Sequence, residues 1–266
     1  MAKPKLILDY DGTLTDVKAN FSEYKERFKN IFSSITEIPL SKLNRIEEVV
    51  RKEVEKDPTR GWENNGAIVA PALTDPYMLN VTVYQGICSK LKMSVEERDN
   101  LLGMCYKEAY SASSTTFKNG LDEFLHDVQD KYDVSVVTNS SKKNVAKDLE
   151  GVDFPSNLVF GGARKYVLDQ DWQEIPISTQ PPDFPRPVML RRKNYFQVLK
   201  RLEASHLDTT VLGDIYEIDL ALPDYLGLEI VHMTNESTPS YETDYINKHP
   251  NGSVVKDLEE AREVLL

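Results

Sequence analysis

Cysteine is scarce in this sequence: Cys88 and Cys105 are the only two among 266 residues. Both stand in apolar, helix-like surroundings, which favours two buried thiols in a reducing compartment over a disulfide. Long apolar runs are absent as well, because no stretch approaches the ~20 apolar residues that a membrane-spanning helix needs. Asp9 and Asp11 interrupt the only early apolar run, which argues against a signal peptide. We therefore expect a cytoplasmic protein without a membrane partner.

Positive charge is also in short supply. The chain has 32 Lys and Arg residues against 43 Asp and Glu residues, which gives a formal net charge of −11. A general nucleic-acid-binding surface needs the opposite balance, so we expect no nucleic-acid partner, although a local basic pocket stays open. No internal repeat is visible, and the length fits one large domain or a core with a smaller insert.

The first apolar run is the stretch around which the chain is organised. Residues 6–8 are uninterrupted aliphatic side chains, the pattern of a strand buried on both faces. Asp9 ends this run and Asp11 follows two residues later, so both carboxylates can leave the strand end on the same side. Two such carboxylates repel each other unless a cation or a shared proton lies between them. A plain Asp-Gly surface turn at Asp11 and Gly12 is the alternative interpretation.

Residues 16–116 have a helical pattern. Apolar side chains recur every three or four residues over 21–35 and again over 43–54. Ser94-Val-Glu-Glu97 is a capping box that opens a further helix. Residues 57–76 hold three prolines and two glycines, and we interpret them as a long loop. The pattern predicts an all-helical insert placed directly after the first strand.

Strand and helix alternate after residue 116. Short apolar strands are expected at 133–140, 157–161, 209–214, 228–233 and 253–255. Strands separated by helices imply right-handed crossovers. We therefore predict that residues 1–15 and 117–266 form an α/β core with a doubly wound parallel sheet. Ligands bind outside the carboxyl ends of the strands in such sheets. Three of these ends carry polar side chains, namely Asp9 and Asp11, Thr138 and Asn139, and Asp214.

Residues 163–187 do not fit this alternation. They contain five prolines, with Trp172 and Phe184 interleaved. We interpret the segment as a solvated extended loop, and a small flap over the site is the alternative.

The polar strand ends suit phosphoryl transfer. A carboxylate is a nucleophile when a metal and cationic groups neutralise the incoming anion. The reaction further needs in-line positioning and donors for the equatorial oxygens. Asp9 and Asp214 are hard oxygen ligands of the kind that Mg²⁺ prefers. Thr138 offers a hydroxyl group and Asn139 a backbone amide to phosphate oxygens, and a lysine would complete the charge balance.

These motifs resemble those of the haloacid dehalogenase (HAD) superfamily of phosphohydrolases. Asp9-Tyr-Asp-Gly-Thr-Leu-Thr15 looks like its first motif, and Val136-Val-Thr-Asn139 looks like its second. Gly213-Asp214 together with Asp219 looks like the fourth motif in a longer-spaced form. The three motifs occur in the family's order and on predicted strand ends.

The third motif of the family, a lysine or arginine at a helix start, has the weakest match. We favour Lys193 in Arg191-Arg-Lys-Asn-Tyr-Phe196, just before an apolar-striped helix. The usual proline after the lysine is absent, so Arg192 and Lys165 remain rivals.

The resemblance implies a role for each residue. Asp9 would be the nucleophile that forms an aspartyl-phosphate, and Asp11 would be the general acid and then the general base. The groups that hold the phosphoryl moiety would be Thr138, Asn139 and Lys193. The Mg²⁺ ligands would be Asp9, the carbonyl group of Asp11, Asp214 and Asp219. Glu217 is an alternative to Asp219.

The expected function is that of a Mg²⁺-dependent phosphatase for a small phosphorylated metabolite, with residues 16–116 as a cap that excludes water and selects the substrate. The second acid, Asp11, is present in the family's phosphatases and lacking in its dehalogenases, so carbon–halogen cleavage is disfavoured. A phosphotransferase or mutase of the same fold is the alternative. A non-catalytic binding protein is disfavoured because Asp9 and Asp11 are both present. Candidates for substrate specificity are Trp62, Asn64, Asn65 and Tyr77.

Overall fold

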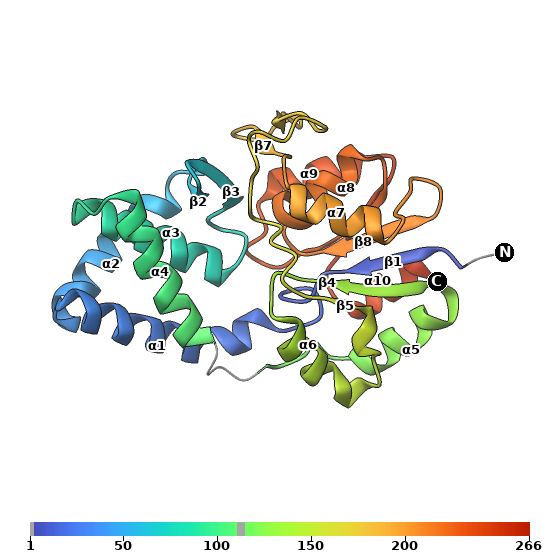
Figure 1. The fold of residues 1–266 in the computed structure, drawn as a ribbon, viewed down its shortest axis with the longest axis horizontal. Helices are drawn as coiled ribbons and strands as arrows, with labels where there is room; N and C mark the ends of the chain where they lie inside the picture. Colours follow the sequence, from blue (N-terminus) through green and yellow to red (C-terminus); the bar gives the residue numbers. More distant parts are fainter. Residues whose placement is uncertain (1–2, 111–114) are drawn as a thin grey trace.

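The protein consists of a sheet-based core and a mainly helical cap that lie side by side (Figure 1). The computed structural model describes residues 3–110 and 115–266. Within these ranges, no helix combines the length and the apolar composition required to cross a bilayer.

The core is built on a six-stranded sheet with the strand order β10-β9-β8-β1-β4-β5, and all of its strand pairs are parallel. Its strands are β1 (Lys5–Leu8), β4 (Asp133–Val137), β5 (Val159–Phe160), β8 (Thr209–Gly213), β9 (Glu229–Met233) and β10 (Gly252–Val255). The first strand of the chain therefore lies inside the sheet, between β8 and β4. The predicted doubly wound α/β fold is confirmed.

Helices cover both faces of this sheet (Figure 1). One face packs against α5 (Leu121–Lys131), α6 (Lys142–Leu149) and α10 (Leu258–Leu265). The other packs against α7 (Lys193–Arg201), α8 (Ala221–Tyr225) and α9 (Ser240–Lys248). Leu6 and Leu8 belong to the first of these two apolar clusters and Ile7 belongs to the second. The apolar run before Asp9 is continuous because β1 is buried on both faces.

The cap has an apolar core of its own. Its helices are α1 (Val17–Thr36), α2 (Leu40–Glu55), α3 (Pro76–Lys90) and α4 (Val95–Tyr110). The predicted capping box opens α4, because Glu97 accepts from the Ser94 amide at 2.8 Å and the Ser94 hydroxyl accepts from the Glu97 amide at 3.3 Å. Cys88 and Cys105 are buried free thiols within this core, as the sequence predicts.

The predicted loop over residues 57–76 is wrong in its middle part, so the cap is not all-helical. Strands β2 (Gly61–Asn64) and β3 (Ala67–Pro71) form an antiparallel hairpin there. Asn65 and Gly66 have φ angles of 50° and 78°, which is the conformation of a type I′ hairpin turn. The Asn-Gly pair was a hairpin signal that the glycines and prolines around it obscured.

The chain leaves the core for the cap near Thr15 and returns near Phe117, and these two connecting segments lie side by side. Thr15 and Phe117 form an isolated antiparallel bridge, and the Asp16 amide donates to the Thr116 carbonyl at 2.8 Å. On this basis we propose residues 16–116 as the cap domain, of which residues 111–114 lie outside the described residues.

The proline-rich segment 163–187 is not a solvated loop. Lys165, Trp172, Ile175 and Phe184 are each at most 7% exposed. The Trp172 ring packs on Phe196 of α7 with 4.9 Å between centroids, and the short strands β6 (Ser178–Thr179) and β7 (Val188–Met189) pair with each other. The apolar side chains between the prolines fasten the segment to the second core cluster.

Candidate active site

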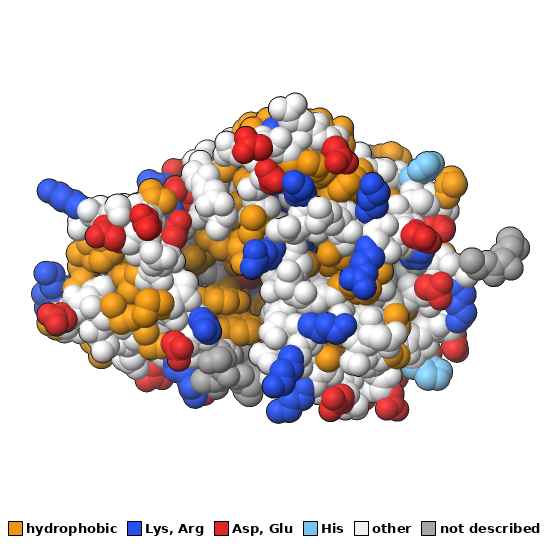
Figure 2. Space-filling view, in the orientation of Figure 1, with side chains coloured by type: hydrophobic (Ala, Val, Ile, Leu, Met, Phe, Trp, Pro, Cys, Tyr) orange, Lys and Arg blue, Asp and Glu red, His pale blue; other side chains and the backbone are white. Residues whose placement is uncertain are grey.

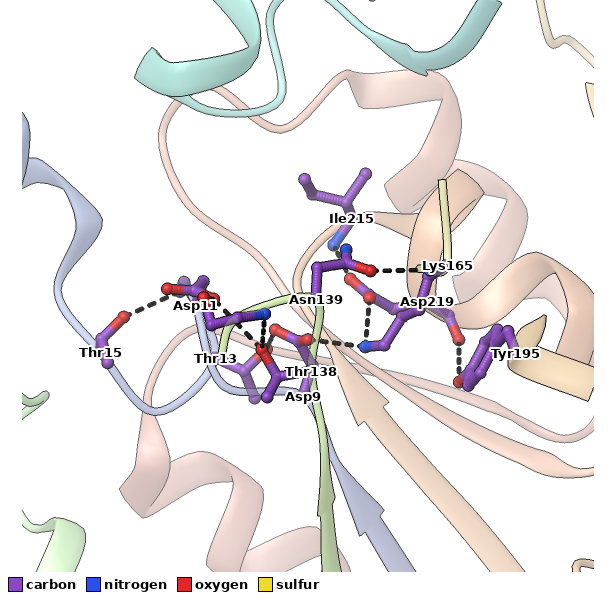
Figure 3. A network of polar contacts seen from close by, with 12 residues as sticks. Asp9, Asp11, Thr13, Thr15, Thr138, Asn139, Lys165, Tyr195, Ile215 and Asp219 are labelled. Atoms are coloured by element: carbon purple, nitrogen blue, oxygen red, sulfur yellow. Dashed lines mark hydrogen bonds and ion pairs between the residues drawn. The ribbon is translucent and has the colours of Figure 1, made fainter. Parts of the chain in front are cut away.

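The polar strand ends meet at one edge of the sheet (Figure 3). Asp9 follows β1, Thr138 follows β4 and Asp214 follows β8, and β1 lies between the other two strands. The Asp9 amide continues the ladder by donating to the Leu212 carbonyl at 2.8 Å. Regular parallel pairing therefore places Asp9 beside two residues that are each more than a hundred positions away from it in the chain.

Lys165 bridges two carboxylates at the centre of this edge. Its Nζ lies 2.6 Å from Asp9 Oδ1 and 2.8 Å from Asp219 Oδ1, and the lysine is 1% exposed. Burial and the Asp219 charge raise the pKa of Asp9 to about 8, against the opposing effect of Lys165. Burial disfavours the charged lysine, but Asp219 and Asp9 outweigh it and raise the pKa of Lys165. Lys165 is thus the ammonium group that contacts the candidate nucleophile.

Lys193, the favoured cation of the sequence analysis, lies elsewhere. It begins α7 as predicted, but its side chain is 44% exposed and its Nζ pairs with Asp169 at 3.2 Å. The helix-start pattern located the helix correctly, but the lysine on its first turn points away from the strand ends. The rival Lys165 takes the place at the site.

Arg192, the other rival, anchors the segment that carries Lys165. Its guanidinium is fully buried and donates to the carbonyls of Met189, Lys165 and Val69 at 3.1, 2.5 and 2.9 Å. Burial lowers the pKa of Arg192 to about 10, so it stays charged at neutral pH. Because Val69 belongs to β3, this one side chain ties the cap hairpin to the core.

Asn139 positions Lys165 from the other side. Its Oδ1 accepts a hydrogen bond from the Lys165 amide at 2.7 Å. The Thr138 carbonyl accepts from the Ala163 amide at 2.9 Å, so the segment after β5 runs along the end of β4. No described group accepts a hydrogen bond from the Asn139 amide, which keeps it free for the phosphate role that the sequence predicts.

Asp11 lies in a cage of hydroxyl groups. Tyr110 Oη donates to Asp11 Oδ1 at 2.6 Å and Ser140 Oγ donates to Oδ2 at 2.7 Å. Thr138 Oγ1 reaches the same oxygen at 3.3 Å. Tyr110 is the last residue of α4 in the cap, so this hydrogen bond joins Asp11 of the core to the cap. The sequence analysis named neither Tyr110 nor Ser140. Ser140 could have been found, because it belongs to the polar run after β4. Tyr110 could not, because its contact with Asp11 is between the cap and the core and has no local sequence pattern.

Three buried carboxylates form an acidic cluster. Asp9, Asp214 and Asp219 each offer an oxygen, and these atoms lie within 4.8 Å of one another. Burial and the Asp219 and Asp9 charges raise the pKa of Asp214 well above its ordinary value. Among the described residues, no group donates a hydrogen bond to the Asp214 carboxylate. A divalent cation relieves such repulsion, and an all-oxygen set fits Mg²⁺.

Gly12 makes room for this cluster. Its φ is +84°, and a Cβ atom added there would lie 2.0 Å from Asp214 Oδ2. Glycine at this position of the first motif is therefore required both by the backbone conformation and by the approach of the carboxylate.

Asp219, rather than its alternative Glu217, lies in the cluster. Glu217 is 1% exposed, and both of its carboxylate oxygens accept from Arg186 Nη2, at 2.7 and 2.9 Å. Residues Tyr216–Leu220 form a π-helical turn, and the Ile215 amide donates to Asp219 Oδ2 at 3.1 Å. This wide turn accounts for the long spacing after Asp214 and directs Asp219 toward Lys165.

No protein-family model matches the sequence, and no curated protein matches it either. Solved structures do match over nearly all of the chain. The HAD-hydrolase YfnB from Bacillus subtilis, described in a magnesium-bound form, is 17% identical with a TM-score of 0.53 over 100% of this chain and 99% of that one. A predicted phosphoglycolate phosphatase from Haemophilus somnus is 14% identical with a TM-score of 0.55 over 99% and 98%. A β-phosphoglucomutase from Thermotoga maritima is 15% identical with a TM-score of 0.53 over 98% of each chain.

The chain has the haloacid dehalogenase fold. At these identities the likeness establishes the arrangement of core and cap, and the chemistry has to be argued from this chain's own residues.

A cavity of about 630 Å³ opens over the site in this HAD fold. Figure 2 shows the hollow between the cap and the core, with hydrophobic side chains along its walls. Three of the four predicted specificity residues, Trp62, Asn64 and Tyr77, line this cavity. Asn65 does not, because it is the exposed corner of the hairpin turn.

Proposed function

We propose that the protein is a HAD-type phosphatase that hydrolyses the phosphate monoester of a small molecule. The observation that carries this proposal is the pair of acids on the central strand end. Asp9 lies against the ammonium of Lys165, and Asp11 lies against the hydroxyl groups of Tyr110 and Ser140. One carboxylate is thus arranged as a nucleophile beside a cation, and the other as a proton carrier.

Mg²⁺ is the proposed cofactor. The side chains of Asp9, Asp214 and Asp219 and the carbonyl group of Asp11 would hold it, and the acidic cluster of the structure supports this choice. When bound, the cation supplies charge neutralisation and orientation for the phosphoryl oxygens.

In the first step, an Asp9 carboxylate oxygen attacks phosphorus in line with the leaving oxygen. The new bond makes an aspartyl-phosphate, and the bond from phosphorus to the leaving oxygen breaks. A proton from Asp11 passes to that oxygen, so the alcohol leaves neutral. Lys165, the Thr138 hydroxyl and the Asn139 amide are the proposed donors to the phosphoryl oxygens, because each lies beside Asp9 or Asp11 in the site.

In the second step, water attacks the aspartyl-phosphate and gives a proton to the ionised Asp11. The hydroxyl groups of Tyr110 and Ser140, at 2.6 and 2.7 Å from the Asp11 oxygens, keep this carboxyl group in place between the two steps. Phosphate leaves and Asp9 is regenerated. If an alcohol replaced water as the acceptor, the same residues would perform a mutase or phosphotransferase reaction, and release of inorganic phosphate distinguishes hydrolysis from it.

The test is phosphate release from p-nitrophenyl phosphate with Mg²⁺ present and after chelation. We expect Asp9→Asn to abolish release without unfolding, because it removes the nucleophile and one metal ligand. Asp169→Asn, at the partly exposed partner of Lys193, is the matched control and should keep full activity. Hydrolysis by Asp9→Asn at the wild-type rate, or full activity in excess chelator, would contradict the proposal.

A further inference from the structure

The cavity over Asp9 is much larger than a phosphoryl group requires. Its volume of about 630 Å³ lies within the range of roughly 300–1,000 Å³ typical of small-molecule sites. The lining extends from Asp9 and Asp11 in the core to Leu102 of α4 in the cap. A substrate that fills this space therefore carries a sizeable leaving group.

Aromatic rings form the walls next to the reacting groups. The Tyr166 ring, which follows the site lysine in the chain, lies 4.8 Å from the ring of Trp62 on β2. A second ring pair also lines the cavity: Tyr106 stacks on Tyr110 with 5.3 Å between centroids and 15° between planes. Tyr110 is also the donor to Asp11. The Trp62–Tyr166 pair thus adjoins Lys165, and the Tyr106–Tyr110 pair adjoins Asp11.

Packing of the cap explains only part of this aromatic lining. Tyr24 and Phe28 are 1% exposed and belong to the apolar core of the cap. Tyr106 also lines the cavity, yet it is 47% exposed. A flat apolar group bound against its ring would cover that surface and stack on it.

The cavity lining is poor in positive charge. Lys147 is the one basic side chain among its described residues. Its carboxylates outside the catalytic groups are Glu63, Asp75, Asp99 and Asp148. Arg98 pairs with Glu63 at 3.0 Å and with Asp99 at 2.7 Å, which leaves Asp75 and Asp148 without a cationic partner among the described residues. These carboxylates would repel a second negative group on a substrate, so the cavity selects against substrates that carry one.

Asn64 adds one polar group to the apolar wall. Its Oδ1 is buried and has no hydrogen-bond partner within the described parts of the chain. The strand that presents it is fixed, because the Gln85 side chain accepts from the Glu63 amide at 3.0 Å and donates to the Glu63 carbonyl at 2.6 Å.

We infer that the substrate is a phosphate monoester of an uncharged alcohol that carries a flat aromatic or apolar group. The ring binds between Tyr106 and the Trp62–Tyr166 pair. This inference rests on the proposed phosphatase function and specifies its substrate class.

A matched series of esters tests the inference. Benzyl, 4-carboxybenzyl and methyl phosphate share one kind of alkyl phosphate linkage and differ in ring and charge. We expect kcat/KM for benzyl phosphate to exceed that for methyl phosphate by roughly 10- to 100-fold, since ring burial stabilises the bound ester. The added carboxylate should remove most of this gain. Equal values for benzyl and methyl phosphate, or preference for the carboxylated ester, would overturn the inference.

Tyr106→Ala tests the wall itself, and Tyr225→Ala is its matched control. Both tyrosines are 47% exposed, but Tyr225 ends α8 and lies outside the cavity lining. We expect the benzyl-to-methyl ratio of kcat/KM to fall roughly 3- to 10-fold in Tyr106→Ala and to stay unchanged in Tyr225→Ala. A ratio that Tyr106→Ala leaves intact would overturn the assignment.

Failure of the proposed function would have a different signature, namely no phosphate release from p-nitrophenyl phosphate or from any ester of the series. Calorimetric binding of benzylphosphonate and methylphosphonate then tests the cavity without turnover. Tighter binding of benzylphosphonate, weakened in Tyr106→Ala, would then support the aromatic ring site while the phosphatase function fails. Equal binding of the two phosphonates would overturn it.

Discussion

Replacement of Lys165 by methionine removes the ammonium group that bridges Asp9 and Asp219. The side chain is 1% exposed and its two contacts are 2.6 and 2.8 Å long. Removing one partner of a buried ion pair costs about 3–5 kcal/mol, because the remaining charge is left uncompensated. We expect a loss of this size in the free energy of unfolding, measured by urea titration in chelator. Phosphatase activity should fall roughly 10²–10³-fold, as when one donor to a developing oxyanion is removed.

Lys193→Met is the matched control for this experiment. Its side chain is 44% exposed and pairs with Asp169 at the surface, so stability and activity should change little. A double variant, Lys165→Met with Asp219→Asn, should recover part of the lost stability, since it also removes one uncompensated carboxylate. The reasoning is refuted if Lys165→Met is as stable and active as the wild type, or if Lys193→Met is the inactive variant.

Three further predictions concern the same site. Gly12→Ala should abolish the rise in melting temperature on addition of Mg²⁺, because its Cβ would lie 2.0 Å from Asp214 Oδ2; unchanged Mg²⁺ affinity by calorimetry would contradict this. Tyr110→Phe should slow hydrolysis of alkyl phosphates more than that of aryl phosphates, because it removes a donor to Asp11; equal losses in steady-state kinetics would argue for a purely structural role. Burial raises the pKa of Asp9 to about 8. A raised folded-state pKa gives stability that is full below the ordinary carboxyl pKa of 3.8 and is lost as pH rises through about 8, so unfolding free energy in chelator should fall from about pH 4 to about pH 8, and Asp9→Asn should flatten this decline.

The strand ends were predictable from the sequence because their signals are local. Three aliphatic residues before Asp9 predict a strand buried on both faces, and the acid marks where it ends. Thr138 and Asp214 follow the same pattern, and parallel pairing then determines which ends are neighbours. These residues needed no knowledge of the tertiary contacts between cap and core.

Lys165 and Tyr110 were not predictable in the same way. Lys165 stands in a proline-rich segment with no periodic pattern, and both its apolar packing and the contact of Arg192 with the Lys165 carbonyl hold this segment in the core. Lys193 had the better local pattern, a helix start, but its ammonium group faces Asp169. Tyr110 reaches Asp11 only because the cap folds over the sheet end. Side-chain direction and contacts between layers decide such positions, and neither is encoded in residue spacing.

The central claim is that Asp9 becomes phosphorylated during turnover. Asp11→Asn should slow attack of water on the aspartyl-phosphate, so the covalent intermediate should accumulate when this variant is mixed with an activated aryl phosphate. Rapid quench followed by peptide mass spectrometry is the measurement. The account predicts one phosphoryl group, located on Asp9. An unmodified protein that still releases phosphate, or a phosphoryl group on another residue, would contradict it.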